Sequence, residues 1–473
     1  MEQKRKEVSI KEKSIFASAD FFGGGGQTIV AVIYLIFLTN VVGINPAWAG
    51  VVIMISKIWD AISDPLMGVI SDNTRSKHGR RKPYIFAGGI ILIFSMALLW
   101  YPVTFGTEVG LIVYVTITYL LYSTVSTMIA VPYSSMSTEV CTNYEETNRI
   151  NLLRLVFSLV STAICTLVPV EVFGALSRGE ISITTFYLII VIGFGLFFSI
   201  PLILAGIFAK ERVYYGDEKS KFSINQFVKP LKVKSFRKLL GLYLCQSTNL
   251  DLLSAIALFY SLYVIKGMDE TIFMASFLVV QLLMLPILNM LVNKTPKTKL
   301  YRFGLPLSII SAIFIGLFPS DGNVIYVYIA TAMMAIGFAG AQTMSWIIFP
   351  DVVDISQLGL GERISGSLSG VMTFIRKVAS AIAIFIIGNV LSFTGYIEPK
   401  GVGDVPIQPD STILGLRVIF IFSWVIIMGI GFILAKRFKI SPQVSKRVKY
   451  FLNKEQLTED EIVEKEELLK EFV

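Results

Sequence analysis

Three charged residues stand inside one apolar stretch of the chain, KIWDAISDPLMG at positions 57–68. Lys57, Asp60 and Asp64 are spaced at i, i+3 and i+7, so on a helix they share one stripe about two turns long. Each charge at a bilayer centre costs on the order of 3 kcal/mol, so the stripe must face a polar interior. Lys57 can neutralise one carboxylate. The other needs a second cation, and a bound Na⁺ or a proton would serve. A purely structural ion-pair network is the alternative.

A glycine run lies in the preceding apolar stretch, DFFGGGGQT at positions 20–28. Glycine costs roughly 1 kcal/mol relative to alanine inside a helix, so four in a row indicate another purpose. They allow either close helix packing or local unwinding beside a ligand, which makes Gly24 a candidate for substrate contact. Asp20 lies one turn before Gly24 on the same side. It is either a ligand residue or a charge at a helix N-terminus.

Other polar residues inside apolar stretches are sparse. Aromatic rings beside hydrogen-bonding groups suit a sugar, which has apolar C–H faces and many hydroxyls. A single Tyr or Trp can equally serve in packing, so the set carries more information than any member. The set comprises Thr127, Tyr133, Ser134, Arg154, Gln246, Asn249, Asp251, Gln342, Thr343, Trp346, Arg376 and Lys377.

The composition predicts that lipid surrounds these residues. Hydrophobic residues make up 54% of the 473 and charged residues only 16%, with a mean hydropathy of +0.68; soluble domains carry roughly 25% charged residues. A membrane helix needs about 20 mostly apolar residues. The polar, basic start has no features of a signal peptide, so the first span is expected to be permanent. Twelve apolar runs are expected, at 15–40, 45–71, 83–104, 109–138, 150–174, 184–209, 238–265, 270–293, 302–319, 323–350, 367–396 and 412–436.

The basic residues predict the orientation. They gather in the N-terminal tail, in the loops after spans two and eight, and in the stretch 210–237, whereas 104–108 and 320–322 have none. The positive-inside rule therefore predicts that both termini are cytoplasmic, in the plasma membrane. It also explains the net charge of +8 without nucleic acid. The expected domains are a six-helix bundle (1–209), a central loop (210–237), a second six-helix bundle (238–436) and a cytoplasmic tail (437–473), an all-α membrane fold with its site between two halves.

The few cysteines and the lone histidine exclude several kinds of site. Cys141, Cys165 and Cys245 are widely spaced with no CxxC pattern, so neither a disulfide framework nor a metal site is expected. His78 has no partner histidine. No His-, Cys- or Ser-centred constellation in the apolar runs supports catalysis, so an enzyme is not expected. The expected cofactors are none beyond the coupling ion, Na⁺ or H⁺.

Short motifs in order along nearly the whole chain resemble the glycoside–pentoside–hexuronide cation symporters of the major facilitator superfamily. The resemblance implies a twelve-helix major facilitator fold and sugar uptake driven by Na⁺ or H⁺. It implies that Asp60, Asp64 and Thr127 match cation-site residues. The matching segments are TNVVG (39–43), KIWDAISDPLMG, TRSKHGRRKPYI (74–85), VPYSS (131–135), PDVVDIS (350–356), GERISGSLSG (361–370), FIRKVASA (374–381) and LSFTGY (391–396).

The resemblance extends to the substrate site and the gate. Arg154 matches a substrate-site arginine, Lys377 matches a lysine that bridges the two sites, and Lys57 stands where the best-known member has an arginine. In major facilitator proteins the loop after span two pins the inward gate, which here implicates Asp72, Arg75, Arg80 and Arg81.

Three departures from the family pattern concern the galactoside-binding half. Gly24 and Ala130 stand where the best-known member has sugar-binding aspartates, and Ser134 stands where it has a tryptophan. The cation half of the pattern is kept. Asp20 is a candidate to replace the missing aspartate of span one.

The sequence therefore predicts a monomeric cation-coupled symporter of a sugar, glycoside or uronide that works by alternating access. The first alternative is a carrier of lysolipid or another amphiphile on the same fold. A membrane enzyme and a sensor that has lost transport are further alternatives. A polar cavity would favour sugar, and a wide apolar cleft open to lipid would favour lysolipid.

Overall fold

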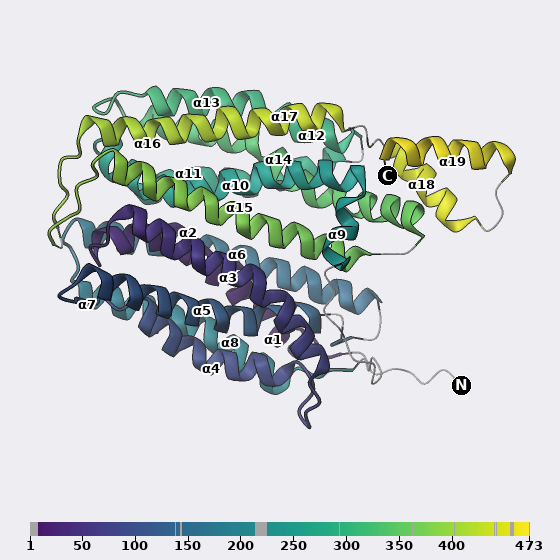
Figure 1. The fold of residues 1–473 in the computed structure, drawn as a ribbon, viewed down its shortest axis with the longest axis horizontal. Helices are drawn as coiled ribbons and strands as arrows, with labels where there is room; N and C mark the ends of the chain where they lie inside the picture. The colour runs from purple at the N-terminus through teal and green to yellow at the C-terminus, as the bar shows by residue number, and fades with distance from the viewer. Residues whose placement is uncertain are drawn as a thin grey trace. The chain divides into compact units, whose positions relative to one another are not determined.

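Every regular element that the computed structural model describes is a helix (Figure 1). The structure describes residues 8–137, 139–141, 144–212, 225–292, 294–361, 364–401, 403–438, 440, 442–454 and 458–472. Residues 4–6 of the basic N-terminal tail and residues 213–224 of the central loop lie outside these ranges.

Contacts divide the chain into two units, Met1–Phe222 with Ile384–Pro409, and Ser223–Ala383 with Asp410–Val473. The expected domains at 1–209, 210–237, 238–436 and 437–473 stay a prediction. The first half of the chain contains α1 (Ile10–Ser18), α2 (Asp20–Asn40), α3 (Pro46–Asn73), α4 (Lys82–Leu99), α5 (Glu108–Met136), α6 (Tyr144–Ser177), α7 (Ile183–Leu188), the π-helix η1 (Ile189–Phe194) and α8 (Gly195–Phe208).

The second half of the chain repeats this order of long helices. It contains α9 (Asn225–Leu231), α10 (Lys234–Phe259), η2 (Tyr260–Val264), α11 (Glu270–Val292), α12 (Lys297–Phe303), α13 (Leu305–Leu317), α14 (Ile325–Leu360), α15 (Ser365–Phe393), α16 (Asp410–Phe422), η3 (Ser423–Ile427), α17 (Met428–Arg437), α18 (Pro442–Asn453) and α19 (Glu459–Phe472).

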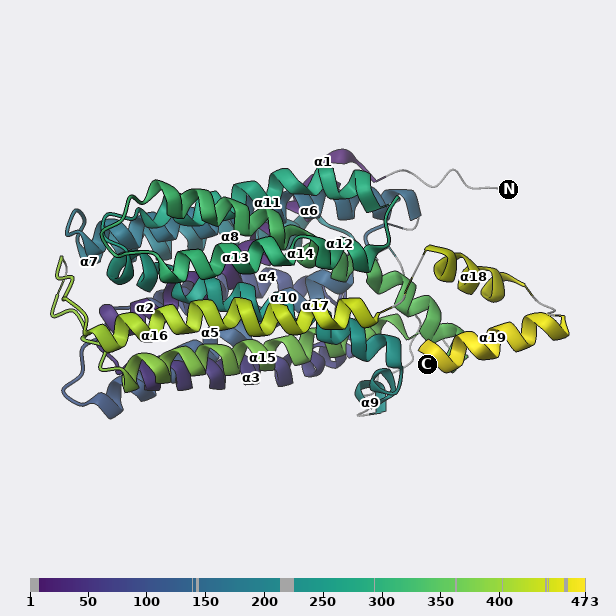
Figure 2. The same cartoon turned by 90° about the horizontal axis from the view of Figure 1, so that it is seen from above.

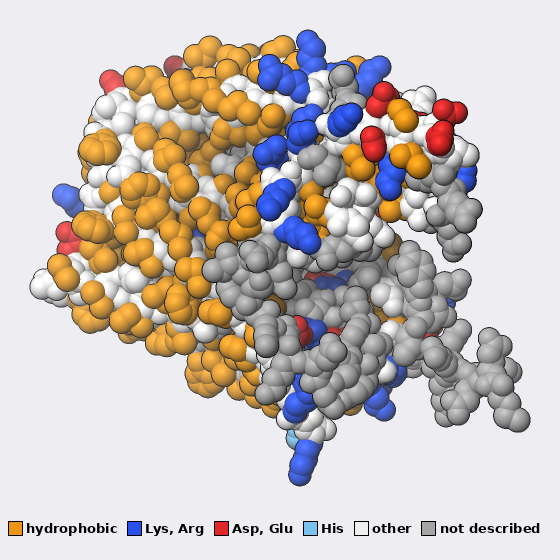
Figure 3. Space-filling view, turned by 45° about the vertical axis from the view of Figure 1, so that its right-hand side comes forward, with side chains coloured by type: hydrophobic (Ala, Val, Ile, Leu, Met, Phe, Trp, Pro, Cys, Tyr) orange, Lys and Arg blue, Asp and Glu red, His pale blue; other side chains and the backbone are white. Residues whose placement is uncertain are grey.

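Eleven helical segments of the described chain are long and apolar enough to cross a membrane. The twelfth expected span is α3, which has 28 residues and is long enough. Its charged stripe, Lys57, Asp60 and Asp64, lowers its hydropathy, so apolarity alone does not identify it. With α3 the spans number twelve, as predicted. Figure 3 shows hydrophobic side chains covering most of the helical surface in view, with Lys and Arg gathered toward one end.

Helix packing follows the same plan in the two halves. In the first unit α3 packs on α5, α4 packs on α5 and α8, and α2 packs on α6. In the second unit α11 and α13 pack on α14, and α13 packs on α16. Spans two, three and four therefore have the same neighbours as spans eight, nine and ten, which is the signature of an internal repeat.

The end of α15 that belongs to the first unit, residues 384–393, packs against α3 through Gly388 and Gly50. A Cβ added to Gly388 would lie 2.3 Å from the carbonyl oxygen of Pro46 and 3.2 Å from the Cα of Gly50. Backbone atoms cannot turn aside as a side chain can. Only glycine therefore permits this approach of the two helices.

We expect Gly388→Val to lower the free energy of unfolding by about 1–3 kcal/mol, because overpacking forces the two backbones apart. Thermal unfolding in detergent, followed by intrinsic fluorescence, measures the effect. Gly370→Val on the same helix is the matched control, since a Cβ there meets no described atom within 4 Å. Equal shifts for the two variants would contradict a packing role for Gly388.

The acidic C-terminal segment forms helix α19, which pairs with the basic helix α18 beyond the end of α17 (Figures 1 and 2). Arg447 pairs with Glu464, and Lys454 Nζ lies 2.7 Å from a carboxylate oxygen of Glu461. Hydrogen bonds from Lys454 and Tyr450 lower the pKa of Glu461 to about 2. The tail is thus a paired helical hairpin in the described residues.

Candidate functional site

Two carboxylates of α3 meet two hydroxyls of α5 in matched spacing. Thr127 Oγ1 donates to Asp64 Oδ1 at 2.8 Å, and the Ser123 hydroxyl donates to Asp60 Oδ1. Each pair is separated by 63 residues in sequence. Because each helix advances four residues between the two contacts, α3 and α5 run in the same direction with their polar stripes in register. The predicted cation residues Asp60, Asp64 and Thr127 therefore lie together.

The two carboxylates differ in exposure. Asp60 is 5% exposed, whereas Asp64 is only half-buried. Ser63 adds another oxygen, since its hydroxyl lies 3.2 Å from that of Thr127. Carboxylate and hydroxyl oxygens are the ligands that hard cations take. Lys57 is half-buried on the same helix, and its expected pairing with Asp60 stays a prediction.

A second cluster joins α2, α5 and α6. Arg154 Nε lies 2.5 Å from Asp20 Oδ2 and donates to the Tyr133 hydroxyl at 3.2 Å. The Tyr133 hydroxyl lies 3.1 Å from Asp20 Oδ2, and its ring centroid is 4.6 Å from the Arg154 guanidinium carbon. Three predicted substrate residues, 134 positions apart at the extremes, are therefore in contact. Asp20 is the first residue of α2, as the helix-terminus alternative expects, and its role as a ligand residue stays a prediction.

Gly24 allows α2 to approach the backbone of α6. A Cβ at this position would lie 2.2 Å from the carbonyl oxygen of Ser158. The Gly24 carbonyl accepts hydrogen bonds from Thr28 at 2.6 Å and from Thr162 at 3.2 Å. The helix is continuous here, so close packing rather than unwinding accounts for the glycine.

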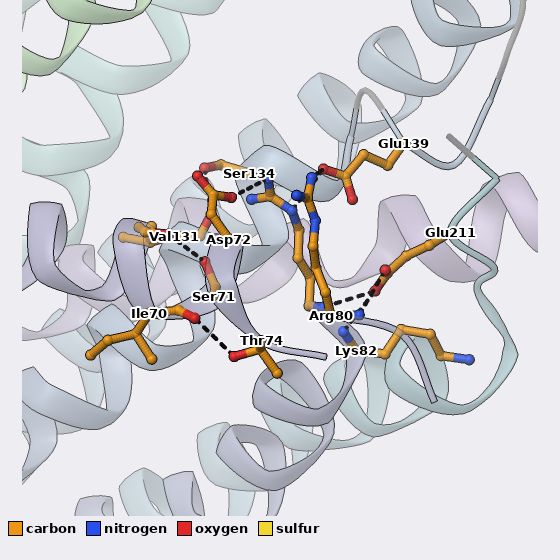
Figure 4. Close-up of polar contacts among 12 residues, drawn as sticks. Ile70, Ser71, Asp72, Thr74, Arg80, Lys82, Val131, Ser134, Glu139 and Glu211 are labelled. Carbon is orange, nitrogen blue, oxygen red and sulfur yellow. Dashed lines mark hydrogen bonds and ion pairs between the residues drawn. The ribbon is translucent and has the colours of Figure 1, made fainter. Parts of the chain in front are cut away.

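The loop between α3 and α4 is held by acidic residues from three segments (Figure 4). Arg81 lies 2.7 Å from Asp72 Oδ1 and 2.8 Å from Glu139 Oε1. Arg80 also contacts Glu139 Oε1, at 2.6 Å. Arg75 instead donates to the carbonyl oxygens of Asp72 and Thr74. The predicted gate residues Asp72, Arg80 and Arg81 thus share one network whose centre, Glu139, was not predicted.

Glu211 closes the other side of this loop. Its carboxylate accepts hydrogen bonds from the backbone amides of Arg80, Arg81 and Lys82, at 2.8, 2.8 and 3.1 Å. These amides lie at the N-terminus of α4, where an acidic group satisfies unpaired donors and complements the helix dipole. Figure 4 shows Glu211 against this turn, opposite Glu139. Glu211 was also not predicted.

We expect Glu139→Gln to lower the free energy of unfolding by about 3 kcal/mol. The substitution removes the buried negative charge that the guanidinium groups of Arg80 and Arg81 share. Glu139 is 1% exposed. The apparent Tm in detergent measures the loss. Glu180→Gln is the control, since Glu180 pairs with Arg178 on the exposed surface at 2.9 Å. A Tm for Glu139→Gln that equals the control would show that the network contributes little.

The second unit places its predicted residues on α14 and α15. The Trp346 ring packs against Tyr243 of α10, with ring centroids 5.3 Å apart, and Lys377 is half-buried. Next to Lys377, Arg376 pairs with Asp251 of α10 at 3.0 Å. Lys297 of α12 pairs with Asp351 of α14 at 2.5 Å. That Lys377 and Arg154 approach the same substrate site stays a prediction.

Several of these partners leave a signal in the sequence. Ser123 and Thr127 repeat the four-residue spacing of Asp60 and Asp64, which a comparison of the two apolar runs could have found. Glu139 and Glu211 lie outside the apolar runs, so only the folded chain reveals that they hold the basic loop.

Comparison with known proteins identifies the family of this chain. The family described as MFS/sugar transport protein matches residues 15–442. The "Uncharacterized symporter sll1374" of Synechocystis sp. is 26% identical over 86% of this chain and 89% of its own length. The "Putative glycoside/cation symporter YagG" of Escherichia coli is 20% identical over 92% and 93%. The crystal structure of the nucleoside transporter NupG superposes with a TM-score of 0.64 at 12% identity, covering 91% of this chain and 99% of that one.

The twelve membrane helices and the charged pairs among them define a membrane-embedded secondary transporter of the major facilitator class, and not an enzyme. The chain belongs to the MFS/sugar transport protein family. This confirms the resemblance stated from the motifs.

Proposed function

We propose that this protein is a Na⁺- or H⁺-coupled symporter of a sugar, glycoside or uronide. The observation that carries the proposal is the matched row of oxygens on α3 and α5. Asp60, Asp64 and Thr127 bind the cation, with Ser123 and Ser63 orienting the carboxylates. A hydroxyl that donates to each carboxylate fixes the direction in which the carboxylate points.

The substrate residues in this proposal are Asp20, Tyr133 and Arg154 from the first unit, with Trp346 and Lys377 from the second; Gly24 shapes the wall behind them. Carboxylate, hydroxyl and guanidinium groups together accept and donate hydrogen bonds, as a sugar requires. The aromatic rings suit its apolar faces. The relative named "Putative glycoside/cation symporter YagG" supports this class of substrate.

Cation binding comes first in the proposed cycle. Neutralising Asp60 and Asp64 stabilises the substrate-competent state, because a ligand shifts an equilibrium only through its differential affinity. A membrane potential of 100 mV supplies about 2.3 kcal/mol per charge moved. Asp72, Arg75, Arg80 and Arg81 hold the gate on the cytoplasmic side, where both termini lie. The protein works as a monomer in the cell membrane.

Counterflow in proteoliposomes tests this proposal directly. Methyl and 4-nitrophenyl glycosides and free uronic acids are exchanged with and without Na⁺ and with and without a pH gradient. We expect exchange of at least one sugar derivative, accelerated by one of the two ions. Exchange of a lysophospholipid without exchange of any sugar derivative would overturn the sugar assignment in favour of an amphiphile carrier.

A further inference from the structure

A second carboxylate–guanidinium pair lies inside the membrane spans of the second unit. Arg376 of α15 donates to Asp251 Oδ1 of α10 at 3.0 Å. Both residues stand well inside their helices, Lys234–Phe259 and Ser365–Phe393. Charges at such positions face the interior of a helical bundle and not lipid. No motif of the family resemblance gives this pair a role.

Arg376 is accessible although it reaches an inner helix. In α10, 78% of the most apolar stretch is buried, the largest share among the candidate spans. Asp251 is accordingly buried, whereas 36% of the Arg376 side chain remains accessible. Arg376 thus reaches inward from α15 to α10 and still has accessible surface.

The pair leaves hydrogen-bonding capacity unused. Asp251 Oδ2 is buried and has no hydrogen-bond partner among the described residues. Buried polar groups are usually satisfied, so this oxygen indicates a missing partner. A hydroxyl group fits it, because a hydroxyl can donate to the carboxylate and accept from the guanidinium of the same pair.

The pair also repeats a feature of the first unit. Asp20 and Arg154 join spans one and five, and Asp251 and Arg376 join spans seven and eleven, the equivalent spans of the second half. Tyr133 contacts the first pair. Equivalent spans of an internal repeat thus carry the same kind of charged pair.

We propose that Asp251 and Arg376 form a hydroxyl-binding pair through which the second half of the chain selects the substrate. The proposal rests on the proposed function and deepens it, because it assigns a named pair of the second half to hydroxyl groups of the substrate.

Replacing both charged residues by apolar ones distinguishes a pair that binds substrate from a pair that only stabilises the fold. Replacing a buried structural ion pair by apolar residues of similar size is often neutral or stabilising, whereas removing one partner is not. We expect the double variant Asp251→Leu with Arg376→Met to insert at the wild-type level and to lose at least 100-fold in counterflow of the glycoside that wild type exchanges fastest. The exposed pair Arg178→Met with Glu180→Leu is the control and should keep wild-type exchange. Wild-type exchange by Asp251→Leu with Arg376→Met would overturn the proposal.

A second experiment needs no substrate, so it remains decisive if wild type exchanges no sugar and the proposed function alone fails. Cys141, Cys165 and Cys245 are replaced by alanine, and Arg376→Cys is combined with Asp251→Asn to keep the site neutral. We expect the water-soluble anion sulfonatoethyl methanethiosulfonate to modify position 376 in proteoliposomes, within about 10-fold of the rate at the exposed control Glu180→Cys. Modification of the control without modification at 376 would show that the pair is sealed from water and does not bind substrate.

Discussion

Asp64→Asn is expected to abolish concentrative uptake while leaving some downhill exchange. The substitution removes a negative charge and a titratable group but keeps the shape of the side chain and most of its hydrogen bonding. In the wild type, Thr127 Oγ1 donates to Asp64 Oδ1 at 2.8 Å. It can still donate to the side-chain carbonyl oxygen of asparagine in the variant. The helix contact is therefore retained, and the cation loses its ligand.

Uptake normalised to membrane-inserted protein, at varied Na⁺ and pH, measures this effect. Asp404→Asn in the loop between α15 and α16 is a matched control outside the spans. If Asp64 has only a structural role, the variant lowers the amount of protein and leaves uptake per inserted molecule unchanged. That result would refute the cation-site assignment.

Asp60→Asn should resemble Asp64→Asn in transport but cost more in folding. Asp60 is nearly inaccessible and contacts Ser123, whereas Asp64 is half-buried. An ion that exchanges with water needs an accessible ligand, so Asp64 is the better candidate for direct contact. Lys57 stands three residues before Asp60 and can pair with it on one helix face, which also favours Asp64 for the cation.

Arg154→Lys is expected to keep the fold and to reduce uptake at least 10-fold. Lysine retains the positive charge beside Asp20, but it lacks the Nε–H group with which Arg154 contacts both the carboxylate and the Tyr133 hydroxyl. Arg154→Gln should be more severe. It leaves the carboxylate of Asp20 buried without its counter-charge, which typically costs about 3–5 kcal/mol.

Apparent Tm and normalised uptake, measured side by side, separate the two effects. For Arg154→Lys we expect a Tm close to wild type with reduced uptake, and for Arg154→Gln a loss of both. Arg178→Lys on the exposed surface controls for the change of side chain alone. Undiminished uptake by Arg154→Lys would remove Arg154 from the substrate site and leave it a purely structural partner of Asp20.

Local physical rules were sufficient to predict the helices and much of the polar stripe. A helix that carries Asp60 and Asp64 four residues apart must place them on one face, whatever surrounds it. The apolar runs predicted the spans because a membrane helix needs about 20 apolar residues. The end of span ten was missed. The expected run ended at Pro350, whereas the helix continues through this proline to Leu360. The residues after Pro350 mix polar and apolar types, so they form helix without extending the apolar run.

The sequence by itself determined the class of protein, the order of its spans and the presence of charges that cannot face lipid, because each follows from composition and helical periodicity. Only the tertiary structure decided which charges meet. Three ion pairs join segments that are distant in the chain: Asp20 with Arg154, Arg80 and Arg81 with Glu139, and Asp251 with Arg376. Each such contact depends on how the helices rotate and approach, and close approaches such as that at Gly24 depend on which backbones lie opposite one another. Periodicity along one helix carries no information about these relations.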